Sequence, residues 1–151
     1  MENIKIRKAK KEDSKKIWEI RNQPISRKYS GNPEKILFKK HKPWFVKKYF
    51  SGEDNHCFIL EDESDLVIGY CRLDFNDDYY VVSIALDAGF QGKGLGHYFL
   101  NEVLRQFHKE KNILAEMQKD NLPSIKLFQK NNFKIYKEDK GKYYLKFIPQ
   151  K

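Results

Sequence analysis

Four glycines and a lysine stand close together in the segment DAGFQGKGLGHYF, which covers residues 87–99 and joins a strand-like apolar run to a helix-like one. A glycine-rich turn of this kind leaves backbone N–H groups unpaired at the positive end of the helix dipole, where they can bind phosphate. Lys93 adds a mobile positive charge. These residues therefore predict that main-chain groups bind a phosphorylated molecule.

Two well-known phosphate loops do not match this segment. The nucleoside triphosphate loop needs G-x-x-x-x-G-K-[ST], but Asp87 stands at the first glycine position and Gly94 follows the lysine. The dinucleotide fingerprint G-x-G-x-x-G fails because Gly96 comes one residue early and no opening βαβ unit precedes it. Neither kind of nucleotide site is predicted.

A third loop matches. The segment resembles the signature [QR]-x-x-G-x-[GA] of the GNAT superfamily of acyl-CoA-dependent N-acyltransferases, here Gln91 to Gly96. The runs SIAL before it and ILAE after the helix, and a helix opening with Asn121, also match the superfamily. The resemblance extends from about residue 3 to residue 148. It implies a single domain over residues 1–151 with the mixed α/β GNAT fold, a central sheet of six to seven strands with a splayed central pair, flanked by about four helices.

The resemblance implies acetyl-CoA as co-substrate and no metal. Main-chain groups of the strand that ends at Leu86 would bind the pantetheine arm and the acetyl carbonyl, because this strand and ILAE are expected to splay apart. The glycine loop would wrap the pyrophosphate, and Asn121 would contact the pantetheine arm from the opposite wall. The implied donor-binding residues are Ile84, Ala85, Leu86, Gln91, Gly92, Lys93, Gly94, Leu95, Gly96, His97 and Asn121.

Direct acetyl transfer needs a base for the amine proton, donors for the developing oxyanion and sometimes an acid for the leaving thiolate. Glu116 occupies the position where ribosomal-protein alanine acetyltransferases of the superfamily place a catalytic glutamate, so it is the candidate base. The tyrosine that often serves as acid is replaced by Phe128, which cannot donate a proton. Tyr136, Tyr143 or water remain as alternatives.

The acceptor is less well defined. The segment RNQP together with HKPWF resembles bacterial acetyltransferases that act on the 4-amino group of nucleotide-linked sugars, which implies that Arg21, Asn22, His41 and Trp44 bind the acceptor. Aromatic residues at helical spacing are also typical of a core, and a single histidine is often structural. Another small amine, a protein or peptide amine, or a non-catalytic module that binds CoA or nucleic acid are the alternatives.

Composition limits the class of protein. The 151 residues carry a net charge of +9 and are 40% apolar, as expected of one folded domain with an affinity for polyanions. The lysines form no block, so nucleic-acid binding is not expected. No apolar run reaches the roughly 18 residues of a membrane span, and the first residues do not resemble a signal peptide. The expectation is a cytoplasmic monomer or homodimer.

Hydrophobic periodicity predicts the elements that position these residues. A strand at residues 3–9 and a helix after Asp13 or Ser14 come first, then two short helices within residues 24–52, with Pro33 and Pro43 as breakers. Three antiparallel strands at 56–63, 66–75 and 79–87 precede a helix over about 94–109, a strand at 113–118, a helix capped by Asn121, and strands at 133–138 and 142–148. A hairpin near residues 63–65 would place Cys57 and Cys71 almost opposite one another.

Overall fold

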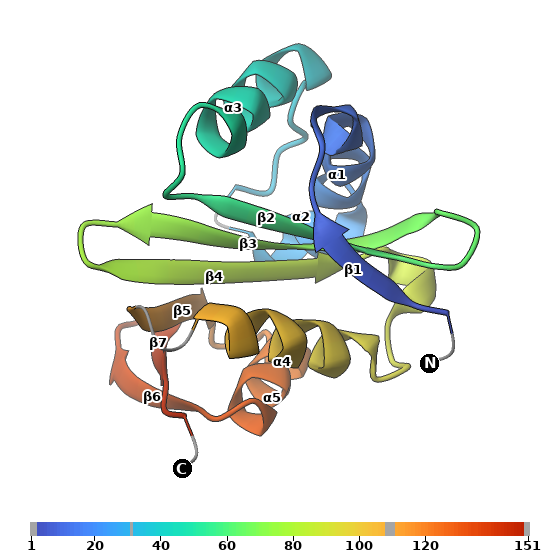
Figure 1. Cartoon of the computed structure of the whole chain (residues 1–151). Coiled ribbons are helices and arrows are strands. Elements are labelled where there is room, and N and C mark those ends of the chain that lie inside the picture. Colours follow the sequence, from blue (N-terminus) through green and yellow to red (C-terminus); the bar gives the residue numbers. More distant parts are fainter. Residues whose placement is uncertain (1–2, 31, 108–110, 150–151) are drawn as a thin grey trace.

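One mixed β-sheet forms the centre of the molecule (Figure 1). The computed structural model describes residues 3–30, 32–107 and 111–149. Seven strands follow one another across the sheet in the order β1 (Lys5–Lys8), β2 (His56–Glu61), β3 (Val67–Asn76), β4 (Tyr79–Leu86), β5 (Asn112–Gln118), β7 (Lys142–Phe147) and β6 (Phe133–Glu138). Every strand predicted from the sequence is confirmed, with ends shifted by two residues or fewer.

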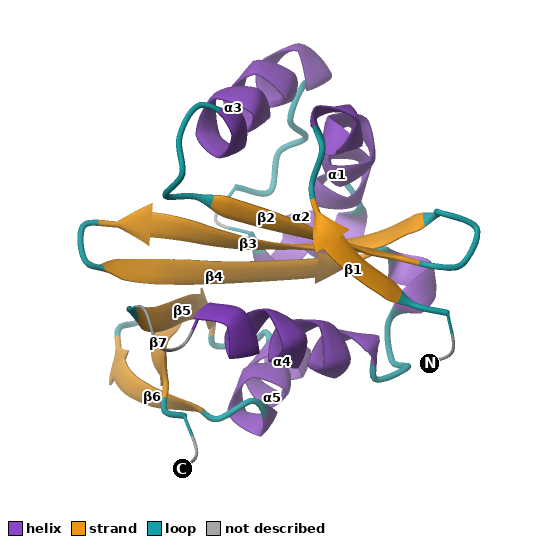
Figure 2. Ribbon diagram, in the orientation of Figure 1, coloured by secondary structure: helices purple, strands orange, loops and turns teal. Residues whose placement is uncertain are grey.

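Helices cover both faces of the sheet (Figure 2). On one side lie α1 (Ser14–Arg21) and α3 (Phe38–Phe50), and on the other α4 (Leu95–Phe107) and α5 (Leu122–Lys130). The short α2 (Pro24–Tyr29) joins α1 to α3, so the described residues form five α-helices, the number that hydrophobic periodicity predicted and one more than the family resemblance implied. None of the described helices is long and apolar enough to cross a membrane. Residues 108 and 109, with which the predicted helix over about 94–109 ends, lie outside the described residues.

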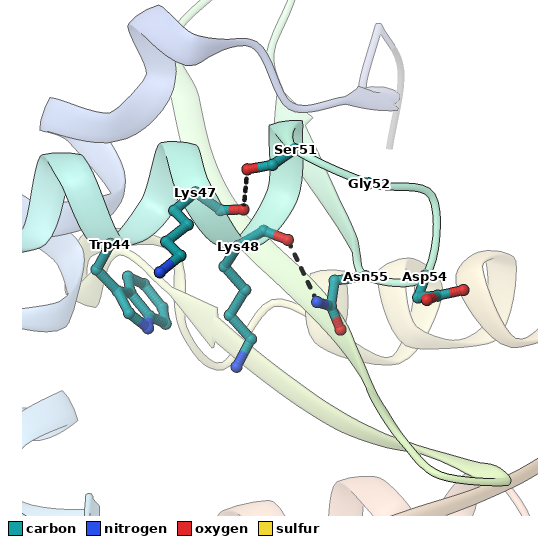
Figure 3. Close-up of a pocket in the computed structure, with 7 residues that line it drawn as sticks. All are labelled: Trp44, Lys47, Lys48, Ser51, Gly52, Asp54 and Asn55. Atoms are coloured by element: carbon teal, nitrogen blue, oxygen red, sulfur yellow. Dashed lines mark hydrogen bonds between the residues drawn. The ribbon is translucent and has the colours of Figure 1, made fainter.

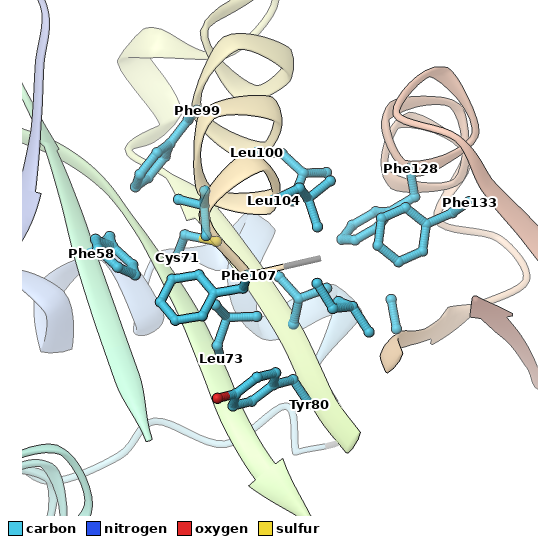
Figure 4. Close-up of a cluster of buried hydrophobic side chains, with 14 of the residues drawn as sticks. Phe58, Cys71, Leu73, Tyr80, Phe99, Leu100, Leu104, Phe107, Phe128 and Phe133 are labelled. Carbon is cyan, nitrogen blue, oxygen red and sulfur yellow. The ribbon is translucent and has the colours of Figure 1, made fainter. Parts of the chain in front are cut away.

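The larger core lies between the sheet and the α4–α5 face (Figure 4). The apolar residues of α4 recur every three or four positions, so they lie on one side of the helix and pack on the sheet. Phe128 of α5 contacts Phe133 edge to face, with ring centroids 4.9 Å apart. A smaller core joins α1 and α3 to the other face, through Ile17, Ile20, Phe45 and Tyr49.

The sheet opens between its two central strands. β4 and β5 run parallel and share only three residue pairs, the first joining Tyr79 to Asn112 and the last joining Val81 to Leu114. Beyond that point β4 stays paired with β3 as far as Leu86, and β5 stays paired with β7 to its end. The predicted splayed pair is confirmed, and the sheet divides into two halves that diverge toward the carboxyl ends of β4 and β5.

The sequence analysis expected Pro43 to break a helix, and this prediction is wrong. It lies inside α3, where it removes one backbone donor. His41, Phe45 and Tyr49 are buried at a spacing of four residues on the inner side of this helix. Packing of that side on the sheet outweighs the local cost of the proline.

The two cysteines lie almost opposite one another, as predicted, but one residue out of register. Cys71 pairs with Phe58, one residue along from Cys57, so the thiols point to opposite faces of the sheet. Cys57 belongs to the core under α1 and α3, and Cys71 to the core under α4. Burial raises the pKa of both thiols, that of Cys57 to about 12, which leaves both protonated at neutral pH. The geometry does not support a redox pair.

Candidate active site

The glycine loop lies where β4 ends and α4 begins. Gly92 and Gly94 adopt φ values of +77° and +79°, the left-handed conformation that side chains disfavour. A Cβ atom at either position would meet nothing within 4 Å, so these glycines serve the backbone conformation and face open space. The first turn of α4 presents N–H groups that the helix itself cannot satisfy. Glycine at these two positions therefore leaves an open cradle at the positive end of a helix.

Side chains at the start of the loop hold its shape. Asp87 accepts a hydrogen bond from the Gly89 N–H at 3.0 Å, which is the main reason why the pKa of this carboxyl lies below its usual value. Gln91 donates to the Leu86 carbonyl at 3.3 Å, and the Lys93 ammonium lies 5.5 Å from the centroid of Phe90. Gln91, Gly92, Lys93 and Gly94 are exposed. Hydrogen bonds within the protein therefore fix the start of the loop, and its central residues stay accessible to a ligand.

Ile84, Ala85 and Leu86 line one wall of the gap between β4 and β5. All three pair with β3 on one side, and β5 has already diverged on the other. Successive backbone groups of a strand point alternately to its two sides, so this stretch presents main-chain N–H and C=O groups to the gap.

Asn121 lies directly before α5, on the opposite side of the gap. Its side-chain oxygen accepts a hydrogen bond from the Ser124 N–H at 3.3 Å and so caps α5. Gly96 in the first turn of α4 faces α5, where a Cβ atom would meet Leu127 at 3.5 Å. These two helix starts therefore flank the mouth of the gap.

Glu116 stands two residues beyond the last pair that joins β5 to β4. Its neighbours Ala115 and Met117 are buried in the α4–α5 core, so Glu116 points to the other face of the sheet, the one that carries α1 and α3. Lys142 of β7 lies 3.3 Å from its carboxylate, and the Glu116 side chain is 49% exposed. This is an accessible carboxylate beside the gap.

No tyrosine replaces Phe128 in α5. Phe128 is 3% exposed and belongs to the core. Of the two alternatives, Tyr136 lies on the edge strand β6, separated from β5 by β7. Tyr143 lies on β7 and pairs with Met117, so it points to the face opposite Glu116. Tyr143 is the nearer of the two to the gap.

Two of the predicted acceptor-binding residues, Arg21 and Trp44, lie in contact on the α1–α3 face. The Arg21 guanidinium lies 4.9 Å from the centroid of Trp44, and that of Arg72 from β3 lies 5.6 Å away. Both distances from a guanidinium to the indole ring are within the range of cation–π attraction. Trp44 is half-buried and also borders a pocket of about 530 Å³, in which it projects from the same side of α3 as Lys47 and Lys48 (Figure 3).

A polar network beside Trp44 was missed in the sequence analysis. Asp74 accepts a hydrogen bond from the Tyr49 hydroxyl at 2.6 Å and lies 3.3 Å from the Lys48 ammonium and 3.6 Å from Arg72. Arg72 and Asp74 are two residues apart on β3, so both point to the α1–α3 face. Two charged residues at this spacing within the apolar run VIGYCRLDF were the available signal.

Asn22 does not lie free for an acceptor. Its amide donates to the Ile36 carbonyl at 2.8 Å and accepts from the Ile36 N–H at 2.9 Å. The Trp18 indole donates to the same carbonyl. Asn22 therefore fixes the segment between α2 and α3, and its polar atoms are occupied within the protein.

His41 is part of the core rather than of the gap. It is 1% exposed and its ring stacks on Phe45, with centroids 5.8 Å apart. Burial, and secondarily the charge of Arg21, lowers the pKa of His41 to about 4. A direct contact with an acceptor is not available to a side chain this deeply buried.

The buried imidazole makes the protein sensitive to acid. Between the folded pKa of about 4 and the ordinary value of 6.5, the unfolded chain binds more protons than the folded one. The free energy of unfolding should therefore fall by about 2 kcal/mol from pH 7.5 to pH 5 through this residue. Urea unfolding at both pH values measures it, and His41→Leu should show a correspondingly smaller loss. An equal loss in wild type and variant would contradict the assignment.

A mixed sheet opened between two parallel strands, with a left-handed glycine loop at the start of the following helix, defines the acyltransferase architecture that the sequence motif implied. The family model described as the acetyltransferase (GNAT) family matches residues 14–133. The chain belongs to this family, and it is an acetyltransferase.

Individual relatives also carry the names of acetyltransferases. Acetyltransferase PseH of Campylobacter jejuni subsp. jejuni serotype O:23/36 (strain 81-176) is 29% identical over 133 residues, covering 85% of this chain and 82% of the relative. YwnH of Bacillus subtilis (strain 168) is 31% identical over 140 residues, with the same coverage. The structure of yncA from Salmonella typhimurium, solved with its cofactor acetyl-CoA, has a TM-score of 0.79 at 19% identity and covers 96% of this chain and 93% of its own.

Proposed function

We propose that this acetyltransferase takes the acetyl group from acetyl-CoA and transfers it to the primary amine of a nucleotide-linked amino sugar. The observation that carries the proposal is the gap between β4 and β5, which ends at an open glycine loop with two left-handed residues. This gap offers main-chain groups of β4 and the N-terminus of α4 along one continuous path.

The residues around the gap fit a donor of this kind. Gly92, Gly94 and the first turn of α4 would hold the pyrophosphate, with the exposed Lys93 beside them. The free edge of Ile84–Leu86 would hold the pantetheine arm as an added strand does, through main-chain hydrogen bonds. Asn121 would contact the arm from the side of α5. When bound, acetyl-CoA supplies a thioester carbonyl that a neutral amine can attack.

The chain would assist the transfer through two groups. Glu116 would accept the proton that the amine loses as its nitrogen bonds to the carbonyl carbon and the carbon–sulfur bond breaks. Main-chain N–H groups of β4 would stabilise the negative charge that develops on the carbonyl oxygen. Phe128 has no proton to give, so the departing sulfur must receive its proton from another donor.

Charge near Trp44 supports an acceptor that carries phosphate. Arg21, Lys48 and Arg72 surround this ring, and Asp74 is the nearby carboxylate that offsets them. Arginine binds phosphate through paired N–H donors, and the indole ring offers a face for a sugar or base. Arg21 and Trp44 are therefore the acceptor-binding residues that we retain.

The test is the release of thiol from acetyl-CoA across a panel of nucleotide-linked amino sugars, polyamines and peptides. We expect the sugars to give kcat/KM values at least about tenfold above those of the others, since the acceptor side is built for a phosphorylated molecule. A preference for peptides would make the protein a peptide N-acetyltransferase. Binding of CoA without turnover of any amine would make it a non-catalytic module.

A further inference from the structure

Helix α2 is anchored in an unusual way. None of the residues from Pro24 to Tyr29 is buried, and Ile25 is 37% exposed. Most helical stability in proteins comes from packing of an apolar side, which this helix of six residues lacks. Its position must therefore depend mainly on polar contacts.

Gln23, at the start of α2, bonds to the segment that leads into the glycine loop. Its side-chain oxygen accepts from the Ala88 N–H at 2.9 Å, and its side-chain nitrogen donates to the Asp87 carboxylate at 3.1 Å. Lys16 of α1 contacts the same carboxylate at 3.6 Å. One uncharged side chain thus joins α2 to the carboxyl end of β4 by two hydrogen bonds.

The other end of α2 is joined to β5. The Ser30 carbonyl, directly after the helix, accepts a hydrogen bond from the Gln118 side chain at 3.2 Å. Gln118 is the last residue of β5. Helix α2 therefore reaches from the end of β4 to the end of β5, the two strands between which the gap opens.

We propose that Gln23 is a positioning residue that couples the donor loop to α2, so that binding of CoA orders α2 on the acceptor side. The inference rests on the proposed donor site. A ligand held by the loop would restrict the motion of Asp87 and Ala88. The two hydrogen bonds of Gln23 would then restrict the start of α2, a helix with no buried residue. Coupling of this kind acts by lowering the frequency of local opening rather than by moving the helix.

Hydrogen–deuterium exchange on the intact protein, with CoA alone as the probe, tests the coupling without an acceptor. In wild type, CoA should slow exchange of the amides in Pro24–Tyr29 by about fivefold or more, the lower range of coupling between sites. In Gln23→Met the same peptide should change by less than about twofold while CoA still protects the glycine loop.

Arg27→Met is the matched control. Arg27 also donates two hydrogen bonds, to the Asn22 and Pro33 carbonyls, but it does not contact the loop. This variant should keep the CoA-dependent protection of α2. Protection that survives in Gln23→Met, or that is absent from wild type although calorimetry detects CoA binding, would overturn the coupling. Absence of CoA binding by wild type would instead refute the proposed function.

Discussion

Glu116→Gln should lower kcat at neutral pH by about 10²–10⁴-fold, the usual contribution of a general base, and leave the calorimetric affinity for CoA unchanged. Glutamine keeps the size and polarity of the side chain but cannot accept the amine proton. Glu116 points away from the α4–α5 core and its side chain is half-exposed, so folding should not depend on its charge. The measurement is steady-state kinetics with the acceptor that the panel identifies.

Glu138→Gln provides the control for this experiment. Glu138 is also an exposed strand glutamate paired with a lysine, its carboxylate lying 3.7 Å from Lys119. It stands on the edge strand β6, so the same chemical change there should leave kcat unaltered. The pH–rate profile should change shape in Glu116→Gln and keep the wild-type shape in Glu138→Gln. A profile that keeps its shape would remove Glu116 as the base.

Much of the fold follows from local patterns along the chain. Alternating apolar residues predict the strands, since burial on one face of a sheet repeats every second residue. Apolar residues at every third or fourth position predict α4, since one side of a helix repeats every 3.6 residues. Asn132, which follows the end of α5, has φ of +69°, a left-handed conformation that asparagine tolerates better than most residues other than glycine.

The site was only partly accessible from the sequence, because a residue type does not reveal which atoms it contacts. Asn22 and His41 have side chains that suit a ligand, yet one bonds to Ile36 and the other stacks on Phe45. Gln23 is part of no sequence motif, although it forms hydrogen bonds with residues that lie 64 and 65 positions away along the chain. Contacts at such separations depend on the tertiary arrangement, which local patterns do not encode.

Register decides on which face of the sheet each cysteine lies. A shift of one residue in strand pairing moves a side chain to the other face of the sheet. Next to the turn Glu61 pairs with Val67, a register that would bring Cys57 opposite Cys71, but the pairing shifts by one residue between Leu60 and Glu61, so Phe58 opposes Cys71. The hairpin could be predicted from the sequence, but its exact pairing depends on this irregularity in the ladder, which no local pattern announces.

Replacing both Gly92 and Gly94 by alanine should weaken CoA binding by about two orders of magnitude. A non-glycine residue in the left-handed region costs roughly 1–2 kcal/mol, and about 1.4 kcal/mol corresponds to a tenfold change in affinity. Alanine at either position meets no steric obstacle from the rest of the chain, so the variant loop can relax to another backbone conformation. Binding must then restore the left-handed shape, and calorimetry with CoA measures that cost.

Gly52→Ala separates this effect from a general response to removing glycine. Gly52 also has open space around its Cβ position, but its φ lies outside the left-handed range. Its replacement should leave CoA affinity unchanged within about twofold. Wild-type affinity in the double loop variant would mean that the left-handed backbone is not what holds the pyrophosphate. Donor binding would then have to rest on the β4 edge and Lys93, and the loop would serve only to connect β4 to α4.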